Sequence, residues 1–529
     1  MSPSKALALW LVAALLCLAS STADGQQQVG TSCSQPRIRK SWDAYTDVEK
    51  ALYVEAVGVA MDRGFHQKFV QIHTEQLTGL EAHQTCVFVY WHRMLLLGYE
   101  NMLRSLNATY QCLTLPYWDH LSGSARQASN NCANIEGCSP IVADFGGTTT
   151  GVAKTLSVYG ANIAYNAKTV CVNQGLAYHF CGNNTGCAHC ILRTRSKYLS
   201  AVTYPTEASF GSVYQQVFTF NDSGSFTSAV ERGIHNAVHN AMGGVMVYFQ
   251  APVDPVFYAH HSLIDLLQTI YLKCQNGDEK LFLSAAAKRS DPRFWTSCAR
   301  SGGGTFSGSD NVTMRALAFD GKTYVNVWQD PNNILYPFFK DLPYKYADYV
   351  DAKDLGNYSY AYGISGGLAN MYQNCDDSNT LGAVSLLANE NQGAALTSAL
   401  PKKAKDPPLP TISDGTDDDD SVKLWQIALF ETAQVLGFDD WAASEQMEMI
   451  TCVHHGECIG SIDDYSALFR ANFGVKGHTR CFSIMQDLAD GTRIIGIPGW
   501  REITDRFLPC PLQDGDDLDG SENAVALDF

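Results

Sequence analysis

The spacing of apolar and polar positions predicts a mainly helical first part of the chain. Within residues 42–118, "WDAYTDVEKALYVEAVGVAMDRGFHQKFVQIH" and "WHRMLLLGYENMLRSL" place apolar residues three and four positions apart, which is the period of one helix face. The same spacing returns at 227–243 and in "HHSLIDLLQTIYLKC". Two helical blocks therefore flank a middle segment of different texture.

The middle segment, about 121–205, is rich in Gly, Ser, Asn and Thr and predicts loops rather than long helices. Its cysteines are Cys132, Cys138, Cys171, Cys181, Cys187 and Cys190. We expect a disulfide-stapled insertion in this segment. After the second helical block the sequence becomes strand-like and loop-rich, with "SGGGTFSGSDN" as a flexible turn region.

The clearest boundary is "LPKKAKDPPLPTISDGTDDDDSV", residues 400–422, where prolines, lysines and a run of four aspartates cannot form a core. We expect 400–422 to be the disordered part of a linker region, 376–422. This linker would separate a catalytic-sized domain, 24–375, from a C-terminal domain, 423–529, that is rich in helix-forming residues and carries four cysteines.

The first residues predict export. "MSPSKALALWLVAALLCLASSTADG" has one early lysine, an apolar run and small residues near Ala23, so residues 1–23 are typical of a secretory signal peptide. No later apolar run is long enough to span a membrane. Of 17 cysteines, 16 follow the signal, and this even number predicts up to eight disulfides in an extracellular protein. Five Asn-x-Ser/Thr sequences agree with glycosylation on that route.

The net charge of −17 argues against nucleic acid or an anionic membrane as a partner, because no basic stripe is present. Acidity of this kind favours solubility.

Candidate chemistry begins in "ERGIHNAVHNAMGG", where His235 and His239 are four residues apart and can face one ion from one helix side. Such a pair arises often by chance among 14 histidines. It has partners here, because His73, His83 and His92 lie within twenty residues of one another, and His261 stands in "YAHHSLID". Imidazole clusters suit copper, zinc, iron or nickel rather than magnesium or calcium.

Two zinc interpretations fit poorly. A zinc protease of the HExxH kind needs a glutamate general base, and Asn236 stands at that position. The "CAHC" sequence at 187–190 is half of a possible zinc or redox site, but a disulfide staple is favoured among so many neighbouring cysteines.

The motifs in their order, "WHR", "YENMLR", "LPYWD", "IHNAVH" and "DPVFYAHHSLID", resemble the tyrosinase family, which comprises tyrosinases, catechol oxidases and molluscan-type haemocyanins. The resemblance covers about residues 36–350. It implies a mainly α fold in which a four-helix bundle holds two copper ions that bind dioxygen. Carried over residue by residue, the first copper would be held by His73, His83 and His92 and the second by His235, His239 and His261.

Two ligand positions leave alternatives. His66 lies seven residues before His73 on the same expected helix face and could replace it. His260 and His261 point in different directions on a helix, so only one can ligate, and the resemblance selects His261. Five other histidines match no ligand position and are expected in the core or on the surface: His120, His179, His189, His454 and His455.

Several neighbours have expected roles. Asp265 lies four residues after His261 and could accept a hydrogen bond from that imidazole. By resemblance, Glu231 and Asn236 would orient a water that deprotonates an incoming phenol. Arg93 and Glu100, seven apart on one helix, are expected to anchor the bundle.

Two further expectations concern motifs of the family. By resemblance, Tyr344 and Tyr346 would form a Tyr-x-Tyr marker facing Arg37 or Arg39. Some relatives join a cysteine covalently to the second histidine, but the matching position here is Glu81, so we expect no such bond.

The resemblance implies a copper-dependent phenol oxidase, a tyrosinase that ortho-hydroxylates monophenols and oxidises o-diphenols to o-quinones with dioxygen. Its partners would be phenolic small molecules or tyrosyl groups and dioxygen. A catechol oxidase without monophenolase activity and a haemocyanin-like oxygen carrier are the alternatives. The C-terminal domain would shield the active site until a processing protease cuts within 400–422.

Overall fold

The structure is a computed structural model that describes residues 33–182, 187–195, 198, 202–301, 303–375, 409–413 and 417–511. The predicted signal peptide, 1–23, and residues 376–408 and 414–416 of the predicted linker region lie outside this part of the chain. The fold is mainly helical, as the sequence pattern predicts.

The first helical block consists of four helices. Its helices are α2 (Asp47–Asp62), α3 (Phe65–Thr74), α4 (Gln76–Ala82) and α5 (Phe88–Ser105). Helix α2 begins with a capping box, in which Thr46 and Glu49 each satisfy the other's free backbone N–H. In α5 every residue from Phe88 to Arg104 is buried, so contacts on all sides hold this helix in place.

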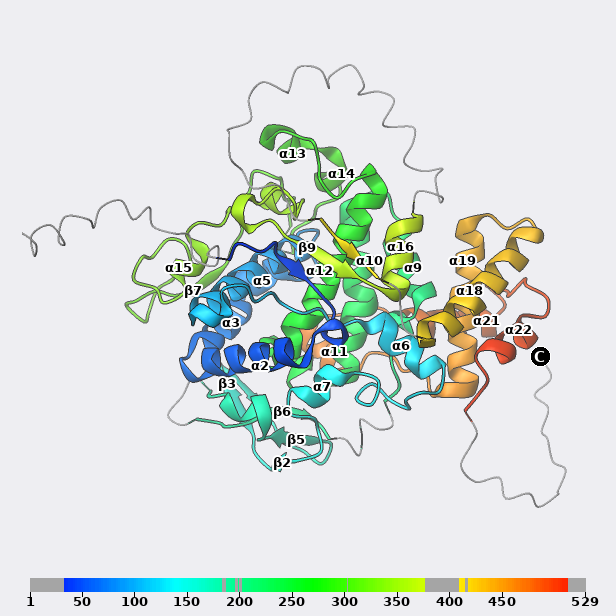
Figure 1. Cartoon of the computed structure of the whole chain (residues 1–529), viewed down its shortest axis with the longest axis horizontal. Coiled ribbons are helices and arrows are strands. Elements are labelled where there is room, and N and C mark those ends of the chain that lie inside the picture. The colour runs from blue at the N-terminus through cyan, green and yellow to red at the C-terminus, as the bar shows by residue number, and fades with distance from the viewer. Residues whose placement is uncertain are drawn as a thin grey trace, which may run out of the picture.

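The second helical block packs against the first. It comprises α9 (Phe210–Phe218), α10 (Ser223–Val230), a π-helical turn (Glu231–His235), α11 (Asn236–Met242) and α12 (Val256–Asn276). Helix α12 lies directly against α5 and is buried from Val256 to Leu272. Figure 1 shows α11 and α12 near the middle of the molecule, with α5 and then α3 beside them. These four elements carry most of the predicted ligands.

The segment 121–205 is held together by its own disulfides, as expected. It contains α6 (His120–Ala128), α7 (Pro140–Asp144) and the strands β2 (Gly151–Val152), β3 (Leu156–Val158), β4 (Ala161–Ile163), β5 (Thr169–Val172) and β6 (Ile191–Thr194). Strands β2, β5 and β6 form one antiparallel sheet and β3 pairs with β4. The disulfides are Cys132–Cys138, Cys171–Cys190 and Cys181–Cys187, so both cysteines of "CAHC" are disulfide-bonded.

The stretch after α12 is irregular and closes the domain. It contains α13 (Ala285–Ser290), α14 (Pro292–Trp295), β7 (Arg315–Leu317), β8 (Tyr324–Asn326), α15 (Tyr336–Phe339), β9 (Ala361–Ile364) and α16 (Gly366–Asn374). Strand β9 pairs in parallel with β1 (Ile38–Arg39) from the start of the described chain and with β10 (Thr411–Ile412). Strand β10 lies within the predicted linker, so part of 400–422 is ordered against the catalytic region.

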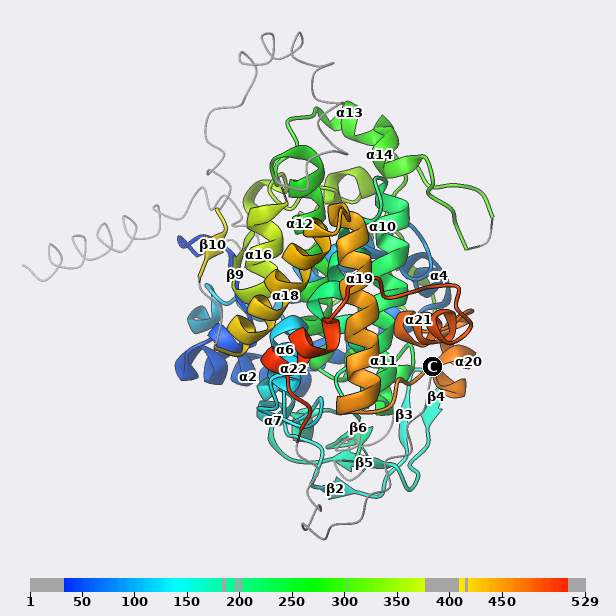
Figure 2. The ribbon, with the colours of Figure 1, turned by 90° about the vertical axis from the view of Figure 1, so that its right-hand side faces the viewer.

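The C-terminal region, residues 417–511, begins with α18 (Asp417–Val435), six residues before the predicted boundary at 423. Its other helices are α19 (Asp440–His454), a π-helical turn (His455–Ile459), α20 (Ala467–Phe473), α21 (Arg480–Ala489) and α22 (Trp500–Phe507). Helix α18 packs on α6 and α19 packs on α9. In Figure 2 these orange and red helices lie in front of the helical centre.

All sixteen cysteines after the predicted signal are paired, which confirms the expectation of eight disulfides. Six pairs join residues within 33–375, and two, Cys452–Cys481 and Cys458–Cys510, lie within 417–511. No disulfide therefore links the C-terminal region to the rest of the described chain. Among the described helices, none is both long and apolar enough to cross a membrane.

Candidate metal centre

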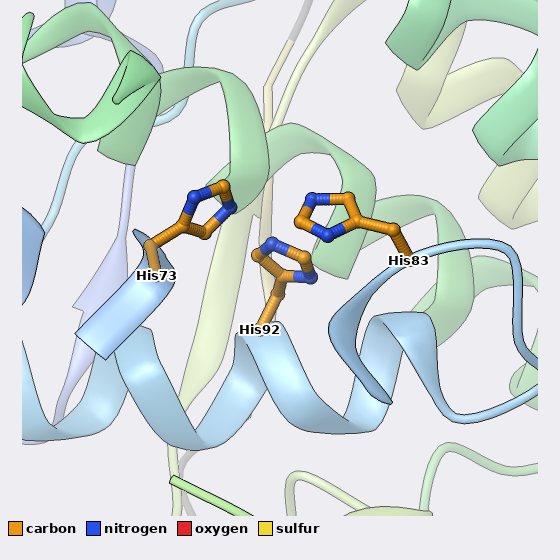
Figure 3. A group of neighbouring side chains, drawn as sticks. All are labelled: His73, His83 and His92. Atoms are coloured by element: carbon orange, nitrogen blue, oxygen red, sulfur yellow. The ribbon is translucent and has the colours of Figure 1, made fainter. Parts of the chain in front are cut away.

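The first histidine group is built from three neighbouring elements. His73 lies in the last turn of α3, His83 follows the end of α4, and His92 lies in α5. One ring nitrogen from each lies within 4.8 Å of the others. Figure 3 shows the three imidazoles pointing toward one another above α5. Three convergent imidazoles from buried elements are a donor set for a transition metal.

The backbone fixes the orientation of each ring in the first group. The Nδ1 atoms lie 2.6 Å from the Phe249 carbonyl for His73, 3.1 Å from the Gly79 carbonyl for His83 and 2.9 Å from the Phe88 carbonyl for His92. A ring whose Nδ1–H donates to a carbonyl presents Nε2 as the free lone pair. The Nε2 atoms of His73 and His92 are buried and have no hydrogen-bond partner among the described residues.

His66, the alternative to His73, lies outside this group. Its Nδ1 is 2.8 Å from the Tyr99 hydroxyl and its Nε2 is 3.1 Å from the Val253 carbonyl. Both nitrogens are thus engaged, and the structure brings His73 rather than His66 to His83 and His92.

The second histidine group contains His235, His239 and His260, whose ring nitrogens also lie within 4.8 Å of one another. Nδ1 of His239 lies 2.7 Å from the Met246 carbonyl, and Nδ1 of His235 lies 3.0 Å from Oδ1 of Asn236. Nδ1 of His260 lies 2.8 Å from Nε2 of His120. The three Nε2 atoms are buried and have no partner among the described residues.

His261, which the family resemblance selects, lies between the two groups. Its ring stacks on His92 with centroids 4.1 Å apart, and its centroid is 4.9 Å from that of His235. Both of its nitrogens are buried without a partner in the described structure. The structure therefore offers two adjacent imidazoles to the second group, one with Nδ1 engaged and one with both nitrogens available.

Burial keeps these imidazoles neutral. Removal from water lowers the pKa of His83 and of His239 to about 4, and it lowers the pKa values of the other members further below the ordinary range. Neutral imidazole is the form that binds a metal ion. Buried nitrogens without partners cost stability unless something binds them, so the two groups fit a pair of copper ions.

The local backbone explains how Glu231 and His235 come to the site. The π-helical turn between α10 and α11 is broken at Gly233, whose backbone is not helical, and the Ile234 N–H donates to Oε1 of Gln216 at 2.8 Å. Single π-helical turns are frequent at functional sites because they re-aim side chains. Here the turn places Glu231 and His235 on one buried stretch beside Asn236.

Glu231 is buried and accepts a hydrogen bond of 2.7 Å from the backbone N–H of Gln84, the residue after His83. Burial raises the pKa of Glu231 to about 8. The carboxyl group therefore takes up a proton near neutral pH, as a group that relays a proton would.

The prediction that Asp265 supports His261 is wrong. Asp265 accepts hydrogen bonds from Nε of Arg93 at 2.5 Å and from the hydroxyl of Tyr360 at 2.5 Å, and it also accepts from Tyr362. These donors, from α5 and β9, satisfy the Asp265 carboxylate, so it forms no hydrogen bond with His261 on the same helix. Asp265 is instead the centre of a buried ionic network with Arg93 and Arg39.

Arg93 and Glu100 anchor the bundle through buried ionic contacts. Glu100 accepts from Arg37 at 2.9 Å and from Arg39 at 3.0 Å, and all of these side chains are buried. Arg39 lies over the ring of Tyr360, 4.0 Å from its centroid.

The tyrosines that contact Arg39 are Tyr360 and Tyr362 in β9, so the expectation that Tyr344 and Tyr346 would face it is wrong. Parallel pairing of β9 with β1 brings that pair to Arg39. Tyr346 instead donates to Oε1 of Glu81 at 2.9 Å.

The remaining histidines have other partners. His120 is buried and connects His260 to the Tyr204 hydroxyl, 2.8 Å from its Nδ1. His179 lies 3.0 Å from Asp62 near the surface. His189 lies near the Cys181–Cys187 disulfide, whose sulfurs are bonded to each other. His454 and His455 are buried in the C-terminal region, and His455 contacts Thr203 at 2.9 Å.

Phe473, from α20 of the C-terminal region, lies against both histidine groups. Its ring centroid is 5.8 Å from that of His83, 6.2 Å from that of His239 and 4.8 Å from that of Phe249. The side-chain amide of Gln84 donates to the Phe473 carbonyl. Sequence reasoning did not identify Phe473 or Gln84, because these contacts join residues 389 positions apart.

Comparison with known proteins places this geometry in a class. The common central domain of tyrosinase matches residues 63–273, which include all six predicted ligands. The tyrosinase of Streptomyces glaucescens is 30% identical over 243 residues, a match that covers 44% of this chain and 80% of that protein. The two buried three-histidine groups are consistent with the binuclear type-3 copper site of this class.

The chain therefore belongs to the tyrosinase family. A tyrosinase-like protein of Diaporthe leptostromiformis is 29% identical over 259 residues, and the match spans 44% of this chain and 61% of that relative. A solved structure of polyphenol oxidase from Thermothelomyces thermophila is 17% identical, with a TM-score of 0.38, and the match covers 62% of this chain and 89% of that one.

Proposed function

We propose that the protein is a secreted copper-dependent phenol oxidase of the tyrosinase type. It ortho-hydroxylates monophenols and oxidises o-diphenols to o-quinones with dioxygen. The observation that carries this proposal is the pair of buried histidine groups, in each of which the ring nitrogens converge and include buried Nε2 atoms without a partner. The stacked rings of His92 and His261 join the two groups. Two coppers bound there supply the redox chemistry with dioxygen.

The ligands we propose are His73, His83 and His92 for one copper, and His235, His239 and His261 for the other. His261 has both nitrogens free and contacts each group. His260, already hydrogen-bonded to His120, competes with it for the third position of the second group. Separate substitutions of His260 and His261 distinguish the two.

Monophenol hydroxylation requires a proton acceptor, and Glu231 with Asn236 supports that role. A phenol has an ordinary pKa of about 10, so it must lose its proton to bind as phenolate. The raised pKa of Glu231, about 8, brings the carboxylate closer to the pKa of its donor than an exposed glutamate would be. Asn236 orients the His235 ring beside it.

The position of Phe473 supports a latent form, in which the C-terminal region covers the copper site. Residues 465–473, which we term the covering segment, form hydrogen bonds with the segments that carry and follow His235 and His239. Asn472 donates to the Val247 carbonyl at 2.7 Å, and the Ser466 N–H donates to Oδ1 of Asn240 at 2.9 Å. Tyr465 donates to the Arg232 carbonyl next to Glu231.

The covering segment is also held by apolar contacts. Tyr465, Phe469 and Phe473 form a cluster with Val247, and each of these side chains is buried. The Phe473 ring lies against one histidine of each group, where a phenolic ring would approach the coppers, so we propose that substrate and Phe473 exclude each other. A processing protease would relieve this block by cutting at the lysines of 400–405.

Oxygen uptake tests the function. Copper-loaded protein, cut by limited proteolysis after Lys402, Lys403 or Lys405, is given a simple monophenol as sole substrate. We expect oxygen consumption with quinone formation. Uptake only with an o-diphenol would instead indicate a catechol oxidase, and reversible oxygen binding without turnover of either phenol would indicate an oxygen carrier.

A substitution in the uncut protein tests latency. Phe473→Ala removes the ring that occupies the substrate position, so we expect monophenol turnover to rise by about tenfold or more, since loss of a buried aromatic contact costs roughly 2 kcal/mol at an interface. Leu468→Ala, on the same helix but 46% exposed, is the matched control and should leave turnover low. Equal activity of Phe473→Ala and the parent would show that the ring does not gate the site.

A further inference from the structure

The segment that carries His83 differs from those of the other predicted ligands. Of the six, all within the described residues, His83 alone lies outside a helix, because α4 ends at Ala82 and α5 begins at Phe88. His83 has extended dihedral angles, φ −130° and ψ 147°, and Gln84 follows with φ 54° in the left-handed region. Main-chain hydrogen bonds of a helix cannot fix this ligand, so other contacts must do so.

One neighbouring segment holds the His83 loop at two points. Cys298 forms a disulfide with Cys86, with Cα atoms 5.0 Å apart. Three residues on, the Ser301 hydroxyl contacts the carbonyls of Leu80 at 2.9 Å and of His83 at 3.4 Å. We call residues 298–301 the brace. It fixes the backbone on both sides of the imidazole.

A second contact holds the start of the loop. The Tyr346 hydroxyl donates to Oε1 of Glu81 at 2.9 Å, and the Thr85 hydroxyl donates to the Glu81 carbonyl at 2.7 Å. Tyr346 is fully buried and Glu81 nearly so. A buried hydrogen bond to a carboxyl group is costly to leave unmade, so it restrains the backbone two residues before the ligand.

The Cys86–Cys298 disulfide is unusual in lying next to a predicted copper ligand. Cys86 is three residues from His83, and no other disulfide of the described chain has a cysteine within five residues of a predicted ligand. It closes a loop with a sequence separation of 212 residues, from the segment between α4 and α5 to the irregular stretch after α14. It therefore ties the ligand loop to a distant part of the fold.

We propose that the brace and Tyr346 are positioning residues for His83, so that the Cys86–Cys298 disulfide holds copper in the first histidine group and not in the second. This inference rests on the proposed copper function. Groups that orient a metal ligand typically change metal affinity or activity by about 10- to 100-fold when they are removed. The second group has helical ligands and needs no such support.

Copper retention tests the brace. The variant Cys86→Ser/Cys298→Ser is copper-loaded and dialysed against a chelator, and copper per chain is followed by plasma mass spectrometry. We expect one of two coppers to leave about 10- to 100-fold faster than in the parent, with the other unchanged. The control is Cys132→Ser/Cys138→Ser, which opens a disulfide in the 121–205 segment and should keep both coppers at the parent rate.

Milder variants keep the test valid if the double-cysteine variant fails to fold. Ser301→Ala and Tyr346→Phe each remove one hydrogen bond, and each should speed the loss of the same single copper by a few-fold, with an unchanged circular dichroism spectrum. In a His83→Ala background, which lacks the ligand itself, Ser301→Ala should change copper loss no further. That non-additivity identifies the first group as the affected site.

The outcomes separate the two proposals. A parent chain that binds no copper would defeat the proposed function. A parent that holds two coppers, with the folded brace variants releasing them at the parent rate, would overturn the brace alone. Equal acceleration for both coppers would also overturn it, because a general loss of stability acts on both groups.

Discussion

The two histidine groups sit side by side but are held by different kinds of contact. In the first group all three Nδ1 atoms lie within hydrogen-bond distance of backbone carbonyls. In the second, His239 uses a carbonyl, whereas His235 uses the Asn236 side chain and His260 uses His120. A backbone carbonyl survives any side-chain substitution, so a substitution can remove the Nδ1 partner of a ring only in the second group.

The largest effect should come from removing a ligand of the backbone-supported group. His92→Ala leaves two imidazoles facing the first copper, so we expect that copper to be lost and phenol oxidation to fall to background. His66→Gln is the control, because His66 is buried nearby but bonds Tyr99 and Val253, and it should keep two coppers. Full turnover by His92→Ala would refute the assignment of the site.

The next substitution decides the third ligand of the side-chain-supported group. We expect His261→Ala to lose one copper per chain and His260→Ala to keep both, because only His261 contacts both groups with two free nitrogens. Copper content of the two purified variants gives the answer. The reverse result would make His260 the ligand and His120 its hydrogen-bond partner.

Asn236 offers a smaller change that only the second group can show. Asn236→Ala removes the side chain at Nδ1 of His235, and we expect copper affinity or monophenol turnover to fall by about 10- to 100-fold. Asn236→Asp keeps an acceptor oxygen and should retain more activity. If both variants behaved alike and like the parent, side-chain support would be irrelevant to the second group.

The smallest expected effect is on copper-free protein, and it concerns the proton on Glu231. Burial raises its pKa from 4.5 to about 8, so between these pH values the folded state binds a proton that the unfolded state has lost. Stability must then fall as pH rises from 4.5 to 8. Denaturant unfolding at pH 5 and pH 8 should show this decline, of a few kcal/mol at most, and Glu231→Gln should reduce it.

Sequence spacing alone located the helices that carry the histidines, because a period of three to four residues is a local property of the chain. It failed for Asp265. The four-residue spacing correctly put the carboxylate on the side of His261, but Arg93 and Tyr360 reach it from elements remote in sequence and bind it more strongly. A charge-assisted bond to a guanidinium outcompetes a neutral imidazole.

Contacts between residues far apart in the sequence account for the other features that the sequence did not predict. Tyr344 and Tyr360 both stand in a Tyr-x-Tyr pattern, and only strand pairing with β1 shows which faces Arg39. The place of Phe473 depends on how a separate set of helices docks on the first, which no local pattern encodes. The four aspartates that predict a linker instead lie in the first turn of α18, which begins at Asp417, before the predicted boundary at 423.

The division of the eight disulfides into two sets that never cross has a consequence for how inhibition would end. In the proposed latent form, the linker of the uncut chain would keep the covering segment at a high effective concentration over the proposed copper site. After a cut, the same contacts join two separate molecules, and their occupancy depends on protein concentration. A cut sample would then stay inactive at high protein concentration and become active as it is diluted, so dilution after the cut would set the time at which activity begins.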